Sequence, residues 1–121
     1  MTADCLFCRI VRGEIPASVV YETDQVLAFR DIDPKTPVHV LVIPRAHHRD
    51  VAALGAADPQ LAGALLAAVS AVADQESVAD DGFRTIFNTG ANGGQEVPHV
   101  HAHVLGGAPV GPMVTARPGA R

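Results

Sequence analysis

Three histidines that alternate with apolar residues constrain the fold of this chain more than any other feature. Residues 99–105 read HVHAHVL, three residues after the sequence NGGQ of residues 92–95. Successive side chains of a β-strand point to opposite faces, so the alternation predicts a strand with His99, His101 and His103 on one face. The apolar residues between and after them are expected to face a core: Val100, Ala102 and Val104.

Imidazoles in a row on a strand suit one of two kinds of ligand. Neutral imidazole is a good zinc ligand, whereas a glycine-rich turn lets main-chain N–H groups approach a phosphate. The alternative is that the histidines have no function and simply lie on the solvent-exposed face of a strand. The turn shortly before the histidines favours a phosphate.

Residues 99–105 resemble the signature of the histidine-triad (HIT) superfamily. Residues 5–16 (CLFCRIVRGEIP) are similar to the start of its nucleoside-phosphoramidase branch, the HINT-like proteins. Residues 27–32 (LAFRDI) and 37–47 (PVHVLVIPRAH) resemble the two central blocks. The four segments occur in the family's order and span most of the chain. The resemblance implies an enzyme that cleaves purine nucleoside 5′-phosphoramidates or related nucleotidyl conjugates.

The resemblance also implies a covalent mechanism without a catalytic metal. The central histidine, here His101, attacks an α-phosphate, because imidazole is largely neutral near pH 7 and leaves again readily. The main-chain carbonyl of His99 holds its tautomer, and His103 donates to a phosphate oxygen. The main-chain N–H near Gly94 and the side chain of Asn88 are further candidate donors. For Asn88, a turn at a strand end is an equally good interpretation.

The family's ribose-binding aspartate corresponds to Asp31, since a carboxylate accepts hydrogen bonds from a vicinal diol. Asp33 is a rival, although the proline beside it indicates a turn. Apolar residues match the positions that enclose the base, and without the resemblance they would be ordinary core residues: Phe7, Ile10, Ile15, Phe29 and Ile32. The turn completes the candidate nucleotide-binding set: Gly94, Gln95 and Glu96.

Cys5 and Cys8 leave three interpretations open: a redox pair, half of a zinc site, or two buried thiols. Zinc needs two more ligands, and the chain offers His47 and His99. The resemblance to HIT relatives with this CxxC motif implies a structural zinc ion whose other two ligands are the histidines equivalent to His47 and His99. The other two histidines are not assigned to a site: His39, expected to be a packed or edge residue, and His48, expected on the surface.

The remaining pattern predicts an α+β fold with one short and one long helix around a five-stranded antiparallel sheet. We expect the helices over 5–13 and from Pro59, capped by Asp58, to 80–82. The expected strands are 19–21, 26–29, 38–43, 83–88 and the histidine run, with a loop over 33–37. A single domain covers residues 1–107 and a tail covers 108–121. The resemblance implies a homodimer that joins two sheets.

Composition excludes several classes of protein. A net charge of −4 without a basic cluster argues against binding long nucleic acid. No apolar run approaches the ~20 residues that span a bilayer, so no membrane protein is expected. Charged residues interrupt any apolar segment at the start, which indicates no secretory signal and a cytoplasmic protein.

Two departures from the HINT-like pattern concern the leaving group. Glu96 stands where those enzymes have a serine, and a general-acid role for it is a hypothesis. The chain has no tryptophan, and so lacks the C-terminal Trp of eukaryotic relatives. Three other functions stay open: a dinucleoside-polyphosphate hydrolase of the Fhit type, a nucleotide-binding or interaction protein with vestigial catalysis, and a metalloenzyme with all three triad histidines on one metal.

Overall fold

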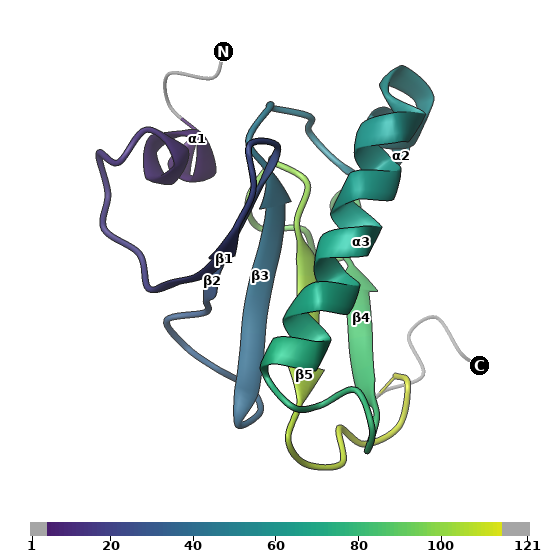
Figure 1. Cartoon of the computed structure of the whole chain (residues 1–121). Helices are drawn as coiled ribbons and strands as arrows, with labels where there is room; N and C mark the ends of the chain where they lie inside the picture. Colours follow the sequence, from purple (N-terminus) through teal and green to yellow (C-terminus); the bar gives the residue numbers. More distant parts are fainter. Residues whose placement is uncertain (1–4, 115–121) are drawn as a thin grey trace, which may run out of the picture.

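A computed structural model describes residues 5–114 and contains one five-stranded antiparallel sheet (Figure 1). Its order is β1-β2-β3-β5-β4, with every neighbouring pair antiparallel. The strands are β1 (Val19–Glu22), β2 (Val26–Arg30), β3 (Val38–Pro44), β4 (Phe83–Phe87) and β5 (Ala102–Gly106). The helices are α1 (Leu6–Val11), α2 (Val51–Ala57) and α3 (Pro59–Gln75). The predicted α+β class and five-stranded sheet are confirmed.

The long helix α3 covers one face of the sheet (Figure 1). Its apolar residues recur at helical spacing and pack against every second residue of the central strands. Members of this core include Leu65 and Val72 from α3, Val40 and Val42 from β3, and Val104 from β5. Burial of such side chains supplies most of the free energy that holds helix and sheet together.

The other face of the sheet packs against α1. Here the alternate residues of β2 and β3 contact the short helix: Phe7, Cys8, Leu27, Phe29, Leu41 and Ile43 belong to one buried cluster. Because α1 has only six residues, it covers only part of this face. The rest stays open and forms the wall of a cleft.

The helix boundaries differ from the prediction in two places. Asp58 caps α3 as expected, with Oδ1 accepting from the Leu61 N–H at 3.0 Å, but α3 ends at Gln75 rather than at residues 80–82. Ser77 then takes a positive φ of 62°, which ends helical geometry. The short helix α2 was not predicted. Asp50 caps it, and it buries only Leu54, so its apolar pattern is weak.

The histidine run is less regular than predicted. The strand β5 begins at Ala102, so only His103 of the three histidines lies in it. The segment before it bends, because the His99 N–H bonds to the Val97 carbonyl at 2.8 Å and the Val100 N–H to the His48 carbonyl at 2.7 Å. The alternation nevertheless persists: Val100, Ala102 and Val104 all lie in the core under α3.

The predicted tail is described only as far as residue 114, and residues 115–121 lie outside the described residues. Residues 108–114 form neither helix nor strand. Arg84 of β4 donates to the carbonyls of Gly111 at 2.7 Å and Pro112 at 3.2 Å. Within residues 5–114, no helix combines the length and the hydropathy needed to cross a bilayer.

Candidate active site

A cleft of about 770 Å³ lies on the face of the sheet that α1 leaves open. Its apolar part comes from α1 and β2 and from the segment that links α1 to β1. Its polar part comes from the loops after β2 and β4 and from the histidine run. Of the residues singled out from the sequence, the cleft is lined by Phe7, Ile10, Ile15, Phe29, Asp31, Ile32, Asn88, Gly94, Glu96, His101 and His103.

The turn between β4 and β5 is built from close main-chain contacts. A Cβ at Gly93 would collide with the Thr89 carbonyl oxygen and would lie 2.8 Å from the Thr89 nitrogen, so only glycine fits there. Gly94 adopts a φ of +76°, which favours glycine for conformational reasons. The Asn88 side chain donates to the Gly93 carbonyl at 2.8 Å, which holds the turn against the end of β4.

The side chain of Gln95 stays inside this turn instead of lining the cleft. Its Oε1 accepts from the Gly90 N–H at 3.0 Å. Its Nε2 donates to the carbonyls of Arg49 at 2.6 Å and Val97 at 3.0 Å. Gln95 therefore fixes the loop that carries Gly94 and Glu96 into the cleft.

His101 is held with one ring nitrogen free. Its Nδ1 lies 2.8 Å from the main-chain carbonyl oxygen of His99. A carbonyl only accepts, so Nδ1 carries the proton and Nε2 keeps its lone pair. Burial lowers the pKa of His101, partly opposed by the carbonyl contact and by the charges of Asp31 and Glu96. Phe7 meets the ring edge-on at 5.1 Å. The result is a neutral, oriented imidazole.

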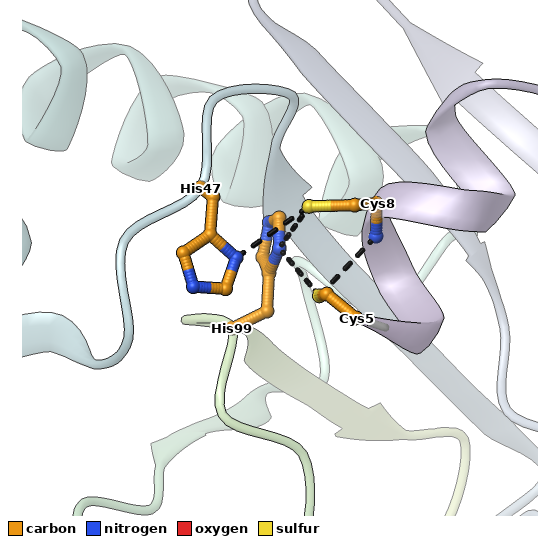
Figure 2. A group of neighbouring side chains, drawn as sticks. All are labelled: Cys5, Cys8, His47 and His99. Atoms are coloured by element: carbon orange, nitrogen blue, oxygen red, sulfur yellow. Dashed lines mark hydrogen bonds between the residues drawn. The ribbon is translucent and has the colours of Figure 1, made fainter. Parts of the chain in front are cut away.

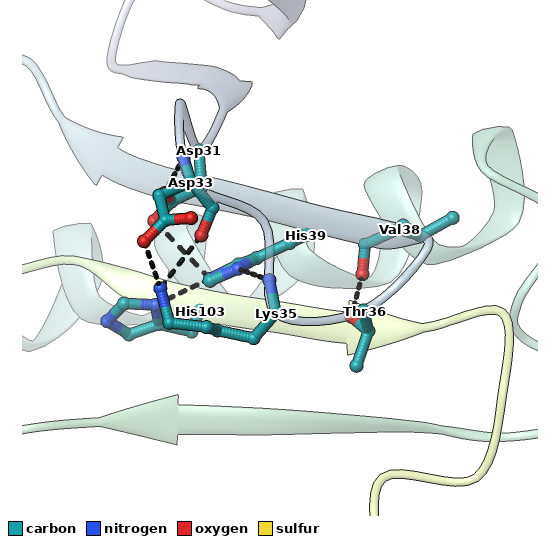
Figure 3. A network of polar contacts seen from close by, with 7 residues as sticks. All are labelled: Asp31, Asp33, Lys35, Thr36, Val38, His39 and His103. Atoms are coloured by element: carbon teal, nitrogen blue, oxygen red, sulfur yellow. Dashed lines mark hydrogen bonds and ion pairs between the residues drawn. The ribbon is translucent and has the colours of Figure 1, made fainter.

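His103 has the opposite tautomer, and His39 is the reason (Figure 3). The Lys35 main-chain N–H donates to His39 Nδ1 at 3.1 Å, so the proton of neutral His39 sits on Nε2. That Nε2–H points to His103 Nδ1 at 2.9 Å. His103 therefore carries its own proton on Nε2. Burial, with the neighbouring His101 and His39, lowers the pKa of His103 to about 4.

Asp31 lies beside this pair of histidines. Its Oδ2 is 3.5 Å from His39 Nε2, and its Oδ1 accepts from the Asp33 N–H at 2.8 Å (Figure 3). Asp33 itself pairs with Lys35 at 2.9 Å in an exposed position. Of the two aspartates considered for the ribose, Asp31 is the one fixed next to the triad.

Asp31, His39 and His103 come close enough together to suggest a metal site, but their hydrogen bonds argue against one. Two imidazole nitrogens on a tetrahedral zinc would be about 3.4 Å apart, whereas those of His39 and His103 are 2.9 Å apart. The His39 atom in question also carries a proton, because Lys35 occupies the other nitrogen. The set is a hydrogen-bonded relay that leaves no lone pair on His39 for a metal.

The apolar end of the cleft is lined by two phenylalanines and three isoleucines among the residues singled out from the sequence. Phe7 and Phe29 are buried and pack edge-to-face with centroids 5.5 Å apart. Ile10 and Ile15 are half-buried, and Ile32 is fully exposed at the rim. The two phenylalanines are therefore core residues as well as cleft residues. The three isoleucines, together with Leu6, have exposed surface left to cover a ligand.

Comparison with known proteins shows the family. The model of the HIT domain matches residues 12–110. This chain belongs to the HIT family. The purine nucleoside phosphoramidase of Escherichia coli K12 is 45% identical over 114 residues, which cover 94% of this chain and 96% of that protein. An uncharacterized HIT-like protein of Synechococcus elongatus is 49% identical over 107 residues, 88% of this chain and 93% of that one.

Solved HIT structures share the fold. A HIT family hydrolase from Clostridium thermocellum superposes with a TM-score of 0.88 at 38% identity, over 94% of this chain and 99% of that chain. A histidine triad protein from Clostridium difficile gives a TM-score of 0.87 at 38% identity, over 91% and 96% of the two chains. The resemblance found in the sequence is thereby confirmed.

A second cluster in this HIT protein joins α1 to the histidine run. It consists of Cys5 and Cys8 of the α1 segment, His47 after β3, and His99 (Figure 2). Their ligand atoms all lie within 4.8 Å of one another. His99 Nε2–H donates to the Pro44 carbonyl at 2.9 Å, which leaves Nδ1 free on the side of the sulfurs.

The distances in this cluster fit a tetrahedral zinc ion. Zinc bonds of about 2.3 Å to sulfur and about 2.1 Å to nitrogen place such atoms about 3.6 Å apart. The Nδ1 of His99 lies 3.4 Å from Cys5 Sγ and 3.6 Å from Cys8 Sγ. The Nδ1 of His47 lies 3.5 Å from Cys8 Sγ. This cluster can hold a metal ion, and its four side chains would fill the coordination shell.

The three triad histidines of this HIT protein do not share one ligand. His99 faces the cysteines, whereas His101 and His103 face the cleft. A catalytic metal on all three would have to pull His99 out of a fully buried position. The geometry therefore separates the run into one fully buried histidine beside the cysteines and two that reach the cleft.

His39 is the site residue that the sequence did not single out. It lies in β3, is buried, and contacts a residue 64 positions away in the chain. An apolar strand interrupted by one histidine was the only available signal. The sequence does not identify His103 as the partner of His39. The two histidines come together only through the pairing of β3 with β5, in which Leu41 lies opposite His103.

Proposed function

We propose that this HIT protein hydrolyses purine nucleoside 5′-phosphoramidates and related nucleotidyl conjugates to a nucleoside monophosphate. The observation that carries the proposal is the orientation of His101. Its Nδ1–H is fixed on the His99 carbonyl at 2.8 Å, so its free Nε2 is available to a substrate in the cleft. The naming of the E. coli relative as a purine nucleoside phosphoramidase supports the same activity.

The reaction takes place in two displacements. His101 Nε2 attacks the α-phosphorus, a P–N bond forms to this ring nitrogen, and the bond to the leaving group breaks. Water then attacks the nucleotidyl-histidine and releases the nucleoside monophosphate and neutral His101. In both steps negative charge develops on the non-bridging phosphate oxygens.

The other polar groups stabilise that charge. The Nε2–H of His103 is set as a donor by the chain from Lys35 through His39. Hydrogen-bond donors that are already oriented need no reorganisation during the reaction, which is why they accelerate it. Gly94 and Asn88 line the same cleft, but the Gly94 N–H already donates to the Ala91 carbonyl at 3.1 Å. The further donor is therefore the second amide hydrogen of Asn88, whose first is donated to the Gly93 carbonyl.

Nucleoside binding uses the remaining side of the cleft. Asp31 accepts hydrogen bonds from the ribose hydroxyls, since its carboxylate is only partly buried and already fixed by the Asp33 N–H. The base packs between the isoleucines of the apolar end, Ile10, Ile15 and Ile32, with the edges of Phe7 and Phe29 beneath them.

The cluster of Cys5, Cys8, His47 and His99 holds a structural zinc ion. Four protein ligands close a tetrahedral shell, and a catalytic zinc needs an open position. Without metal, the pKa of the Cys8 thiol is raised to about 11. Burial is the largest cause, and the hydrogen bond and the charge of Cys5 raise the pKa further. A bound zinc ion stabilises the thiolate and so offsets the free-energy cost of ionising the buried Cys8. It also anchors α1 to the histidine run.

The chain acts as a homodimer that joins two sheets. β4 is an edge strand of the sheet, with β5 on one side only. An open edge of five residues offers main-chain donors and acceptors to a second copy. Phe83 on this strand is 38% exposed and Leu66 on α3 is 56% exposed, which provides apolar area for such a contact.

One experiment tests the function directly. The pure protein is incubated with adenosine 5′-phosphoramidate, with and without a chelator, and AMP release is followed by chromatography. We expect release by the native protein in both conditions and by His48→Ala, whose side chain lies outside the cleft. We expect none from His101→Ala. Binding of AMP without any turnover would indicate a nucleotide-binding protein instead.

A further inference from the structure

Both cationic and anionic side chains line the cleft, and they differ in whether they already contact a partner. Three lysine or arginine side chains line it: Arg30, Lys35 and Arg84. Three carboxylates also line it: Asp31, Asp33 and Glu96. Which of these charges is free to meet a substrate depends on what each already contacts.

Every cation of the cleft already has a partner. Arg30 makes a double contact with Glu76, at 2.8 and 3.2 Å. Arg84 donates both terminal nitrogens to main-chain carbonyls of the segment after β5. The exposed pair of Lys35 with Asp33 is weak, but the charge of Asp33 stays beside Lys35 and cancels it. Carboxylates thus neutralise Arg30 and Lys35, whereas Arg84 keeps its positive charge, because carbonyls are neutral. Arg84, however, lies near the start of β4 and is held by the segment after β5, whereas Glu96 follows the turn at the other end of β4.

Glu96 is the opposite case. It is exposed, it lines the cleft, and it has no ion-pair partner within residues 5–114. It follows Gly94 by two residues and precedes His101 by five, on the segment whose main chain Gln95 fixes. The apolar wall for the nucleoside comes instead from α1 and β2. An uncompensated negative charge therefore lies on the part of the cleft that the nucleoside leaves free.

We infer that Glu96 determines the leaving group: it favours amines, which become cations, and rejects polyphosphates. This inference rests on the proposed function and specifies the substrate class of the same site. Substrates with an anionic leaving group, such as dinucleoside polyphosphates, are disfavoured because their extra phosphates meet the charge of Glu96, with which no lysine or arginine among residues 5–114 forms an ion pair.

The chemistry of the two leaving groups explains the selection. When His101 attacks a phosphoramidate, the P–N bond breaks with its electron pair on nitrogen, and the nitrogen takes one proton from solvent to leave as an amine. At neutral pH an alkylamine then binds a second proton and departs as an ammonium ion. Hydrolysis of the nucleotidyl-histidine by water returns one proton and restores His101. A polyphosphate instead departs as a multiply charged anion past the same carboxylate.

The test compares two substrates in matched variants. The substrates are an adenosine 5′-phosphoramidate of a primary alkylamine and diadenosine tetraphosphate. The variants are Glu96→Gln, which removes the charge and keeps the shape, Glu96→Asp, which keeps the charge, and Asp24→Asn, which removes one negative charge in the exposed β1–β2 turn outside the cleft. The readout is the ratio of kcat/KM for the two substrates.

We expect Glu96→Gln to shift that ratio about tenfold towards the tetraphosphate, the order of one charge pair at a solvent-facing site. Glu96→Asp and Asp24→Asn are expected to keep the native ratio. The shift should shrink as salt is raised from 0.05 to 0.5 M, because screening weakens exposed charges.

Two outcomes overturn the inference and leave the proposed function intact. One is an unchanged ratio in Glu96→Gln while the native protein cleaves the phosphoramidate. The other is an equal loss on both substrates, which would make Glu96 a part of the general chemistry. If the native protein cleaves neither substrate, the proposed function itself is wrong.

Discussion

The Nδ1 atom of His101 lies 2.8 Å from the carbonyl oxygen of His99, whose own imidazole lies between Cys5 and Cys8. One residue thus belongs to both sites: its side chain faces the metal-ligand cluster and its main chain sets the tautomer of the proposed nucleophile. The position of His101 therefore depends on how firmly His99 is held. Both the Pro44 carbonyl and the cysteine cluster hold it.

Loss of the proposed zinc ion is expected to lower the stability of the fold more than the rate of the chemical step. Zinc that binds only the folded state adds about 4 kcal/mol when its free concentration is a thousandfold above Kd. Cys8→Ser should bind no zinc by elemental analysis and should unfold at a lower Tm than the native protein. An unchanged Tm together with one bound zinc per native chain would contradict a structural role.

Replacement of His39 is expected to lower kcat and to leave KM nearly unchanged. His39→Phe removes the Nε2–H that fixes the His103 tautomer, so His103 can no longer be held as a donor. We expect a fall of about tenfold to hundredfold, less than the roughly 10²–10³ for loss of a whole oriented donor, because His103 itself remains.

His39→Gln provides the control for that replacement. Its amide can still donate to His103, so it should keep more activity than His39→Phe. Equal losses in the two variants would show that packing, and not hydrogen bonding, is the contribution of His39.

Acid is expected to destabilise the fold through His103. Its pKa is lowered to about 4 in the folded state, so between pH 6.5 and pH 4 the unfolded chain binds more protons than the folded one. Stability therefore falls as the pH falls through this window. Between pH 7 and pH 5 the loss from this residue is about 1–2 kcal/mol.

Urea unfolding at pH 7, 6 and 5 measures this effect. His103→Gln cannot titrate and should show a smaller loss over the same range. The same pH dependence in both proteins would rule out His103 as the source.

Three glycines are expected to respond differently to alanine. Gly93→Ala places a Cβ against the Thr89 main chain and should disrupt the turn, with loss of both stability and activity. Gly94→Ala has free space but a φ of +76°, and should cost about 1 kcal/mol. Gly63→Ala, within α3 and free of contacts, should stabilise by about 0.5–1 kcal/mol. Chemical denaturation ranks the three, and a neutral Gly93→Ala would contradict the close approach.

A charge on the β4 edge is expected to weaken the proposed dimer. Thr85→Lys places a cation in the middle of the open strand, where two copies would bring the charges together. Ala52→Lys adds the same charge on the exposed surface of α2 and serves as the control. Sedimentation over a range of concentrations distinguishes them, and equal masses for both variants would place the interface elsewhere.

The sequence by itself determined which residues share a face and which kinds of element form. The alternation of residues 99–105 placed Val100, Ala102 and Val104 in the core although the strand starts only at Ala102. Asp58 and Pro59 identified the start of α3 because a cap acts through its own neighbours. The short α2 escaped prediction, since seven residues with one buried side chain give little periodicity.

Beyond the roles that the family resemblance implied, only the tertiary structure decided how each histidine is held. Strand pairing brings His39 to His103 across 64 positions, and packing of α1 brings Cys5 to His99 across 94. His39, His101 and His99 take their tautomers from main-chain atoms, the Lys35 N–H, the His99 carbonyl and the Pro44 carbonyl. His103 takes its tautomer from the ring of His39. The periodicity of the sequence predicts only to which face each side chain of one segment points. These hydrogen bonds join segments that are far apart in the sequence, and they form only when the strands pair and the core packs.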